Sequence, residues 1–198
     1  MTTVIYLVRH GVHDQLEGRL CGRTPGVLMG EAGLAQAARA AERLAGLGID
    51  AVRSSPIERT RQTAKVIAER CGLPLRLDDA LAEIDFGDWN GRTFESLEPE
   101  PLWRRWNADR DQVRPPGGET MLEVQVRLAR WLEGVVADGA SAIAAVSHAD
   151  VIKALVALVL GLPLRAHDRF EIGPGSITTV VAGDWGLKLH GLNEAPNG

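Results

Sequence analysis

The chain has 198 residues, of which 45% are hydrophobic and 24% are charged, and its formal net charge is −4 at pH 7. This composition is typical of a globular protein in water, and the slight negative charge argues against nucleic acid as a partner. Two cysteines are too few for a disulfide scaffold, and no apolar stretch is long enough to span a membrane or to serve as a signal peptide, so we expect a cytoplasmic protein.

The first 77 residues alternate short apolar runs with a helical pattern. The apolar runs predict strands over residues 4–8, 51–54 and 75–77. A polar, glycine-bearing loop is expected over residues 12–30. Residues 31–47 carry alanine and leucine at helical spacing, which predicts a helix.

A second helix is predicted directly after the strand over residues 51–54. Ser55 is expected to cap it, Pro56 suits the first helical position, and Glu58 completes a capping-box pattern. This helix should end near Arg70.

Residues 78–118 differ from the rest of the chain because their helical pieces are short and they are rich in tryptophan and proline. We interpret this segment as a lobe inserted into one edge of a single domain that covers residues 1–198.

The second half resumes the alternation of helices and strands. A helix is predicted over residues 119–136, where apolar side chains form a stripe at helical spacing. A strand over 141–146 leads into a helix that ends near Leu160, with Ser147 and Asp150 as its expected capping box.

The chain is expected to finish with strands over residues 176–181 and 185–190. Alternating strands and helices indicate an α/β fold with a mostly parallel central sheet and helices on both faces, which is a three-layer sandwich. Ligands in such folds bind at the carboxyl ends of the strands.

Three predicted strand ends carry basic side chains. Arg9 and His10 follow the first strand, Arg59 lies in the first turn of the helix after the second strand, and His148 follows the strand over 141–146. Helix N-termini add backbone N–H groups, so these junctions predict an anion pocket that suits phosphate.

A neutral imidazole beside a bound phosphoryl group can attack it and form a covalent phosphohistidine. Arginines stabilise the charge on the phosphoryl oxygens, and an acid must protonate the leaving oxygen. Glu83, Asp85 and Asp88 are the candidate acids, and this chemistry alone does not choose among them.

These residues occur in five ordered motifs that span nearly the whole chain, and the chain resembles the histidine phosphatase superfamily, which includes the phosphoglycerate mutases. The motifs are Arg9–Gly11, Ser54–Ala64, Leu81–Gly91, Pro116–Thr120 and Ser147–His148. The family's acid falls on Glu83.

The resemblance implies a role for each residue of the predicted pocket. It makes His10 the nucleophile and Glu83 the acid, while Arg9, Arg59 and His148 hold the phosphoryl group. It implies no metal and no organic cofactor.

Gly11 and His13 complete the expected substrate-binding set. Where many relatives carry Ser or Thr and a nearby Asn after this motif, the chain has His13 and Asp14, so the substrate is open. His13 and His10 form a His-x-x-His pair, but a loop without a matching carboxylate motif argues against a metal site. His167 and His190 are expected on the surface.

The expected activity is that of a phosphomonoester phosphatase acting on a small phosphorylated metabolite. The chain is shorter than typical phosphoglycerate mutases, which favours a phosphatase over a phosphomutase. A non-catalytic module that binds a phosphorylated ligand is the alternative from another functional class. The chain is expected to be a monomer or a homodimer.

Overall fold

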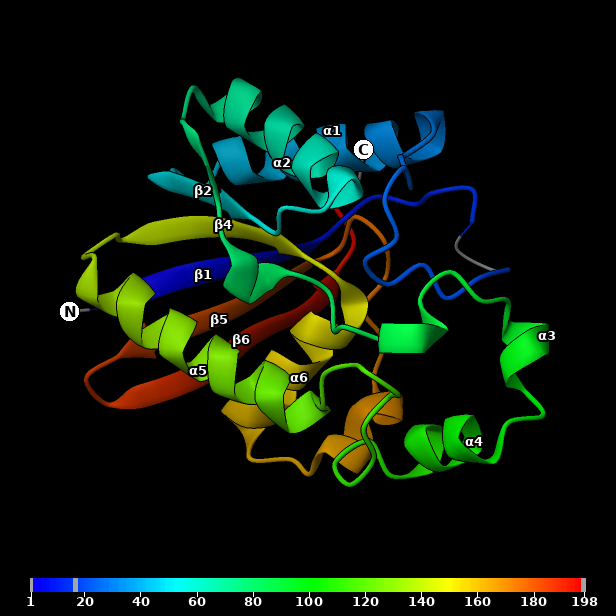
Figure 1. Cartoon of the computed structure of the whole chain (residues 1–198). Coiled ribbons are helices and arrows are strands. Elements are labelled where there is room, and N and C mark those ends of the chain that lie inside the picture. The colour runs from blue at the N-terminus through cyan, green and yellow to red at the C-terminus, as the bar shows by residue number, and fades with distance from the viewer. Residues whose placement is uncertain (1, 16–17, 197–198) are drawn as a thin grey trace.

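The computed structural model describes residues 2–15 and 18–196, and these residues form one six-stranded sheet (Figure 1). The strands lie in the order β3-β2-β4-β1-β5-β6. Their bounds are β1 (Thr2–Arg9), β2 (Ala51–Ser54), β3 (Leu75–Leu77), β4 (Ala142–Ser147), β5 (Ile177–Gly183) and β6 (Gly186–Glu194).

Four neighbouring strands of the sheet are parallel to one another, and each of the last two is antiparallel to the strand before it in the sheet order. β3, β2, β4 and β1 run in the same direction, β5 runs antiparallel to β1, and β6 runs antiparallel to β5. In this register Val146 of β4 lies opposite both Val8 and Ser54. The carboxyl ends of β1, β2 and β4 therefore meet at one edge, as the strand-end argument requires.

Long helices cover both faces of the sheet, which confirms the predicted fold class. Figure 1 shows α1 (Glu31–Ala45) and α2 (Glu58–Cys71) on one side, with α5 (Met121–Ala137) and α6 (Ala149–Leu160) on the other. A left-handed Gly72 ends α2, and Gly161 ends α6 in the same way.

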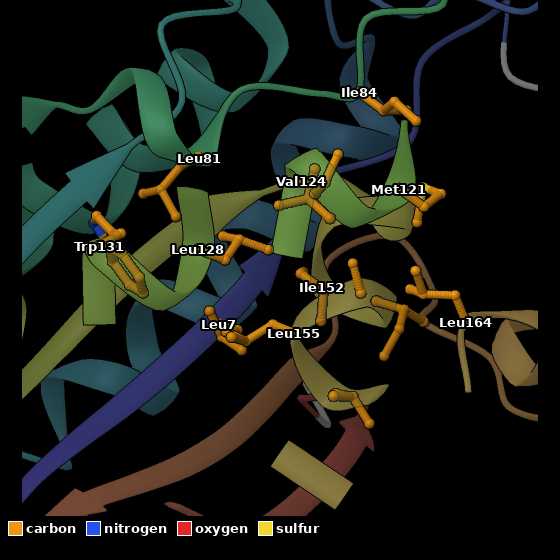
Figure 2. Close-up of a cluster of buried hydrophobic side chains, with 14 of the residues drawn as sticks. Leu7, Leu81, Ile84, Met121, Val124, Leu128, Trp131, Ile152, Leu155 and Leu164 are labelled. Atoms are coloured by element: carbon orange, nitrogen blue, oxygen red, sulfur yellow. The ribbon is translucent and has the colours of Figure 1, made fainter. Parts of the chain in front are cut away.

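Alternating side chains of the strands feed two separate hydrophobic clusters, one on each face. Val8 of β1 belongs to the cluster beneath α1 and α2, whereas Leu7 points into the cluster beneath α5 and α6. Figure 2 shows part of the second cluster, where Leu128 of α5 and Leu155 of α6 gather beside Leu7.

The predicted apolar stripe of α5 is confirmed. All six of its members are buried, namely Met121, Val124, Leu128, Trp131, Leu132 and Val135. The helix begins two residues later than expected because Thr120 is its cap. The Thr120 hydroxyl accepts from the Glu123 N–H, and the Glu123 carboxylate accepts from the Thr120 N–H, which is a complete capping box.

Residues 78–118 form short helices rather than long ones. These are the 3-10 turns η1 (Asp79–Leu81) and η2 (Gly87–Trp89) and the helices α3 (Phe94–Leu97) and α4 (Pro101–Ala108). Figure 1 shows α3 and α4 at the end of the sheet opposite the N-terminus, which is where β1 ends.

Aromatic side chains anchor this lobe to the rest of the molecule. Trp89, Trp103 and Trp106 pack against one another, with ring centroids 5.3 to 6.0 Å apart. They belong to the same hydrophobic cluster as Leu7 of β1 and Leu128 of α5. The lobe therefore packs directly on the sheet and its helices.

Two predicted helix caps are wrong. α2 begins at Glu58 with Ile57 as its cap and no side-chain capping bond. The Ser55 hydroxyl accepts from the Ile57 N–H over 3.3 Å, before the helix begins, and lies 2.9 Å from Nε2 of His148. α6 is capped by His148, and the Ser147 hydroxyl donates to the Leu81 carbonyl over 2.7 Å. Both serines are thus used to build the strand-end region rather than to start a helix.

The expectation for surface histidines holds at one position only. His190 is exposed, but His167, in the 3-10 helix η3 (Leu164–Arg169), is buried. Within residues 2–15 and 18–196, no helix has the length and apolar character needed to cross a membrane.

Candidate active site

The edge where β1, β2 and β4 end brings together four of the predicted site residues. Arg9 ends β1 and His10 follows it, Arg59 lies in the first turn of α2, and His148 caps α6. His10, Arg59 and His148 are buried, and the ring centroids of the two histidines are 5.3 Å apart. Residues separated by up to 139 positions in the sequence therefore share one small polar site.

The hydrogen bonds of His10 define its tautomer. Nδ1 lies 2.8 Å from the Gly11 carbonyl oxygen, to which it can only donate, so Nε2 carries the lone pair. Nε2 accepts from Nε of Arg59 over 3.2 Å. Burial, followed by the positive charges of Arg59 and Arg9, lowers the pKa of His10 well below its ordinary value. His10 is thus a neutral imidazole with a directed lone pair.

Arg59 lies between the two histidines. Its Nη2 donates to the Gly22 carbonyl over 2.7 Å and to Nδ1 of His148 over 3.1 Å. Its Nη1 is buried and has no hydrogen-bond partner among the described residues. Buried guanidinium donors without a partner are costly unless a ligand uses them, so this nitrogen favours an anionic ligand.

Arg9, which precedes His10 in the chain, also has a buried nitrogen without a partner among the described residues. Its Nη1 donates to the Ile172 carbonyl over 2.6 Å, which fixes the guanidinium. Its Nε is buried and unpaired within the described part of the chain. Two arginines therefore present spare donors around one neutral imidazole.

His148 is fully buried behind Arg59. Since Nδ1 accepts from Arg59, Nε2 carries the proton and donates to the Ser55 hydroxyl over 2.9 Å. Nδ1 also lies 3.8 Å from Oε2 of Glu83. Burial, followed by the charge of Arg59, lowers the pKa of His148 well below its ordinary value.

Three backbone contacts hold the segment that carries Glu83. Nη2 of Arg127 donates to the Ala82 carbonyl over 2.8 Å, and Nε of Arg23 donates to the Glu83 carbonyl over 2.7 Å. Oε1 of Glu83 accepts from the Ile84 N–H over 3.0 Å. Burial, with the neighbouring charge of Asp150, raises the pKa of Glu83 to about 7.

The structure separates Glu83 from the other two candidate acids. Asp88 is exposed, and Asp85 is occupied by its own turn, where it accepts from the Gly87 N–H and from the Asn90 amide. Glu83 alone among the three is buried and lines the cavity beside His10.

The Pro-Gly-Gly-Glu motif is hydrogen-bonded through its backbone to the segment that follows Glu83. The Asp88 N–H donates to the Pro116 carbonyl over 2.9 Å, and the Glu119 N–H donates to the Asp85 carbonyl over 2.7 Å. A Cβ at Gly118 would lie 2.3 Å from that same carbonyl oxygen, so only glycine allows this approach. The motif thus has a physical role in placing Glu83.

A cavity of about 200 Å³ opens at this edge of the sheet. Sequence reasoning identified four residues of its wall, Arg9, His10, Arg59 and Glu83, and added His13 as a possible one. The other lining residues are Arg19, Leu20, Cys21, Gly22, Phe86, Phe94, Ala149 and Asp150. Arg19, Leu20, Cys21 and Gly22 lie in the loop over 12–30, Phe86 and Phe94 lie in the lobe, and Ala149 and Asp150 begin α6. Phe86 falls within the Leu81–Gly91 motif, and the other residues lie outside the five motifs.

His13 and Gly11 have different relations to this cavity. The His13 ring lies 5.5 Å from that of His10, and burial, followed by Arg59 and Arg9, lowers its pKa to about 4. The wall formed by the described residues includes neither Gly11 nor His148. The Gly11 N–H donates to the Thr63 hydroxyl over 3.2 Å, and a Cβ there would lie 2.3 Å from the Gly33 carbonyl oxygen.

A larger cavity of about 1010 Å³ lies between α1 and the strands β5 and β6. Its floor is mainly apolar, with Val4, Tyr6 and Ile177, and it contains none of the strand-end residues. We therefore assign the chemistry to the smaller cavity. Among the described residues, no group of three or more His, Cys, Asp or Glu side chains could hold a metal ion.

Comparison with known protein families identifies one match over nearly the whole chain. The family model described as the histidine phosphatase superfamily (branch 1) matches residues 5–195. A protein named probable phosphoglycerate mutase GpmB from Enterobacter sp. (strain 638) is 35% identical, over 94% of this chain and 92% of the relative. A protein of the same name from Salmonella paratyphi B is 38% identical over 89% and 83%.

Solved structures match the chain equally completely. A putative alpha-ribazole-5'-P phosphatase from Escherichia coli superposes with a TM-score of 0.87 at 26% identity, over 99% of this chain and 98% of that one. A mycobacterial glucosyl-3-phosphoglycerate phosphatase superposes with a TM-score of 0.88 at 27% identity, over 98% and 100%.

Proposed function

Because the chain belongs to the histidine phosphatase superfamily, we propose that it is a phosphomonoester phosphatase that acts on a small phosphorylated metabolite through a phosphohistidine at His10. One observation carries the proposal. The Nε2 lone pair of the neutral His10 imidazole lies beside Arg59, both Arg59 and Arg9 have a buried nitrogen without a partner among the described residues, and Glu83 lines the same cavity.

In the first step, the hydrogen bond from Nε of Arg59 to Nε2 of His10 opens, the freed Nε2 lone pair attacks the phosphorus atom, and the ester P–O bond breaks. Arg9 and Arg59 donate to the non-bridging oxygens and stabilise their charge during transfer. His148 contributes by holding Arg59. Glu83 gives its proton to the leaving oxygen, which departs as an alcohol.

In the second step, Glu83 is a carboxylate and accepts a proton from water as the water attacks the phosphohistidine. The P–N bond breaks, inorganic phosphate leaves, and His10 and Glu83 return to their starting protonation states. Glu83 thus serves as acid and then as base, and its pKa of about 7 suits both tasks near neutral pH.

His13 and Gly11 are assigned supporting roles. His13 is neutral at physiological pH and lines the cavity, so it can donate or accept a hydrogen bond with the substrate. Gly11 acts through the backbone, since its lack of a side chain lets the loop after β1 pack against Gly33 of α1.

A phosphomutase is the second candidate function. Relatives with 35% and 38% identity carry the name probable phosphoglycerate mutase, whereas structural neighbours carry the names of phosphatases. The two activities share the first step and differ in the second, in which a mutase returns the phosphoryl group to the alcohol rather than to water.

A labelling experiment tests the shared first step. The protein is exposed briefly to a ³²P-labelled aryl phosphate, and the acid-labile label on the chain is measured together with phosphate release. We expect both for the wild type and neither for His10→Ala. His190→Ala is the matched control, because His190 is exposed and lies outside the cavity.

Label and phosphate release, together with separate measurements of phosphoglycerate conversion and of phosphate binding, discriminate among the three functions. Phosphate release with label on His10 supports the phosphatase. Label without release, together with conversion of 3-phosphoglycerate to 2-phosphoglycerate, supports the mutase. Binding of phosphate with neither label nor release supports the non-catalytic module and refutes the enzyme mechanism.

We also propose that the protein acts in the cytoplasm, as a monomer or a homodimer, on small molecules rather than on nucleic acid. The net charge of −4 and the free thiols of Cys21 and Cys71 support this proposal.

A further inference from the structure

An ion pair between a buried arginine and a half-buried aspartate borders the candidate active site, and the proposed mechanism does not use it. Asp150 lies in the first turn of α6, two residues after His148, and lines the same cavity as Glu83. Its Oδ1 accepts from Nη1 of Arg110 over 2.7 Å. Arg110 comes from the lobe, directly after α4.

The lobe holds the Arg110 guanidinium firmly. Arg110 is only 9% exposed, and its guanidinium carbon lies 3.8 Å from the ring centroid of Trp106. Its Nη2 reaches Oδ1 of Asn107 over 3.4 Å. An arginine that is stacked and hydrogen-bonded in this way fixes the carboxylate that it binds.

Asp150 is therefore ionised although it is half-buried. Burial alone would favour the neutral acid, but the charges of Arg110, His167 and Lys153 outweigh it and lower the pKa of Asp150. Glu83 has a different environment, because among the described residues the ion-pair partner of its carboxyl group is the His148 ring, which is neutral.

We infer that Asp150 is a positioning residue that acts through Glu83, and that its fixed negative charge keeps the Glu83 carboxyl group protonated until the leaving oxygen takes the proton. This inference rests on the proposed function of the site. It also gives the lobe a chemical task, since Arg110 is the side chain that holds Asp150 in place.

When two carboxyl groups at one site have different surroundings, one can stay protonated and act as the acid while the other stays ionised. Here Glu83 is the acid and Asp150 is the ionised group. Burial is the largest contribution that raises the pKa of Glu83, the charge of Asp150 is the next, and Arg59 and Arg127 oppose both. Removing Asp150 should therefore lower the pKa of Glu83 only in part, because the burial remains.

Other titratable and charged groups surround this pair. Those that face Glu83 are Arg59 from α2, Arg127 from α5, His148 from the start of α6 and Arg23 from the loop over 12–30. Those that face Asp150 are Arg110 from the lobe, Lys153 from α6, His167 from η3 and Arg9 from β1. Asp150→Asn removes one negative charge from this set, and its loss lowers the pKa of His167 further.

The first measurement is the pH dependence of kcat/KM for an alkyl phosphate, whose leaving oxygen needs a proton. Asp150→Asn keeps the shape of the side chain and removes its charge. We expect the alkaline limb of the profile to move to lower pH by about one unit. An aryl phosphate with a good leaving group needs less protonation, so its alkaline limb should move much less.

Asp88→Asn is the matched control, because it makes the same chemical change on an exposed carboxylate of the acid segment. Its profile should coincide with that of the wild type. A purely structural role of the Arg110–Asp150 pair predicts lower stability of Asp150→Asn with an unshifted alkaline limb, and that result would overturn the inference.

A second measurement does not depend on activity. The carboxyl carbon of Glu83 is titrated by NMR in the wild type and in Asp150→Asn, with Glu83→Gln used to assign the signal. A midpoint lower by about one pH unit in the variant supports the inference, and an unchanged midpoint overturns it. If the wild type neither turns over nor becomes labelled, the proposed function fails while this titration still decides the role of Asp150.

Asp150→Asn leaves Arg110 buried without its anion, which can prevent folding. The double variant Asp150→Asn with Arg110→Met removes both charges and keeps the stacking on Trp106 apolar. It should still show a downward shift of the Glu83 midpoint, smaller than in Asp150→Asn, because loss of the Arg110 cation acts in the opposite direction but Arg110 is not among the main groups that shift Glu83. A wild-type midpoint in a folded double variant would overturn the inference.

Discussion

Arg59→Lys tests whether the site needs the fork of a guanidinium or only a positive charge. The substitution keeps the charge at the centre of the site. It removes the arrangement in which Nε donates to His10 while Nη2 donates to Gly22 and to His148. A single ammonium group cannot reproduce donors on two separate nitrogens, and Nη1 is lost as well.

The size of the effect follows from these contacts. Loss of one preorganised donor to a developing oxyanion costs on the order of 10²–10³ in kcat. The buried acceptors that lose their donor, such as the Gly22 carbonyl, should destabilise the fold by about 1–3 kcal/mol. Activity should therefore fall by at least two orders of magnitude in a protein that still folds.

Steady-state hydrolysis of an aryl phosphate measures the activity, and urea denaturation measures the free energy of unfolding. Arg61→Lys is the control, since Arg61 lies two positions further along α2 and is exposed. If Arg59→Lys and Arg61→Lys lose equally little activity, charge alone is sufficient and the reasoning from the guanidinium geometry is refuted.

Four further results are expected. Glu83→Gln should lower kcat/KM for alkyl phosphates by about 10²–10⁴, and an equal loss for aryl phosphates would contradict its role as acid. Because the pKa of Glu83 is about 7, wild-type kcat/KM for alkyl phosphates should fall about tenfold per pH unit above pH 7. A flat alkaline profile would exclude protonated Glu83 as the acid of the first step. Gly118→Ala should reduce activity and melting temperature, because its Cβ would lie 2.3 Å from the Asp85 carbonyl oxygen. As its control, Gly134→Ala, in open space on α5, should stabilise the fold by about 0.5–1 kcal/mol. Thr120→Ala should cost about 1 kcal/mol in urea denaturation through loss of the cap of α5, and an unchanged midpoint would show that the cap is not needed.

Periodicity predicts the layers of this fold well because burial on each face repeats along the chain. The strand over 51–54 and the strand over 75–77 coincide with the observed bounds, and the stripe of the helix over 119–136 is buried throughout. The helix repeats its apolar residues at the helical period, and the two strands are short runs bounded by turn residues, so no long-range information is required.

The wrong caps have a common physical reason. A serine before a helix can satisfy the helix or a distant partner, and the sequence does not distinguish the two. Ser55 and Ser147 both bind residues far along the chain, His148 and Leu81 respectively. The pairing of Asp150 with Arg110 was missed for the same reason, since 40 positions separate them and Asp150 fits a local capping pattern.

The cavity has two walls that come from different parts of the chain. This difference explains why the sequence predicts the phosphoryl-transfer residues but leaves the substrate open. The strand ends supply Arg9, His10 and Arg59, whose positions the sheet register fixes. The opposite wall comes from the loop over 12–30 and the lobe, which pair through their backbones. The Leu20 N–H donates to the Arg92 carbonyl over 2.9 Å, and the Gly91 N–H donates to the Leu20 carbonyl over 2.8 Å.

Apart from Glu83, the second wall can change the side chains that face the cavity, because it is held by backbone hydrogen bonds and by side chains buried in the hydrophobic cluster, the tryptophans among them. Phosphoryl transfer needs the first wall and Glu83 to be constant, whereas recognition of the leaving group needs the rest of the second wall to vary. A family built in this way can keep one reaction and accept different substrates, as the differing names of its similar structures suggest. Since the Arg110–Asp150 pair links the lobe to the cavity beside Glu83, a change in the lobe can alter acid strength and specificity together.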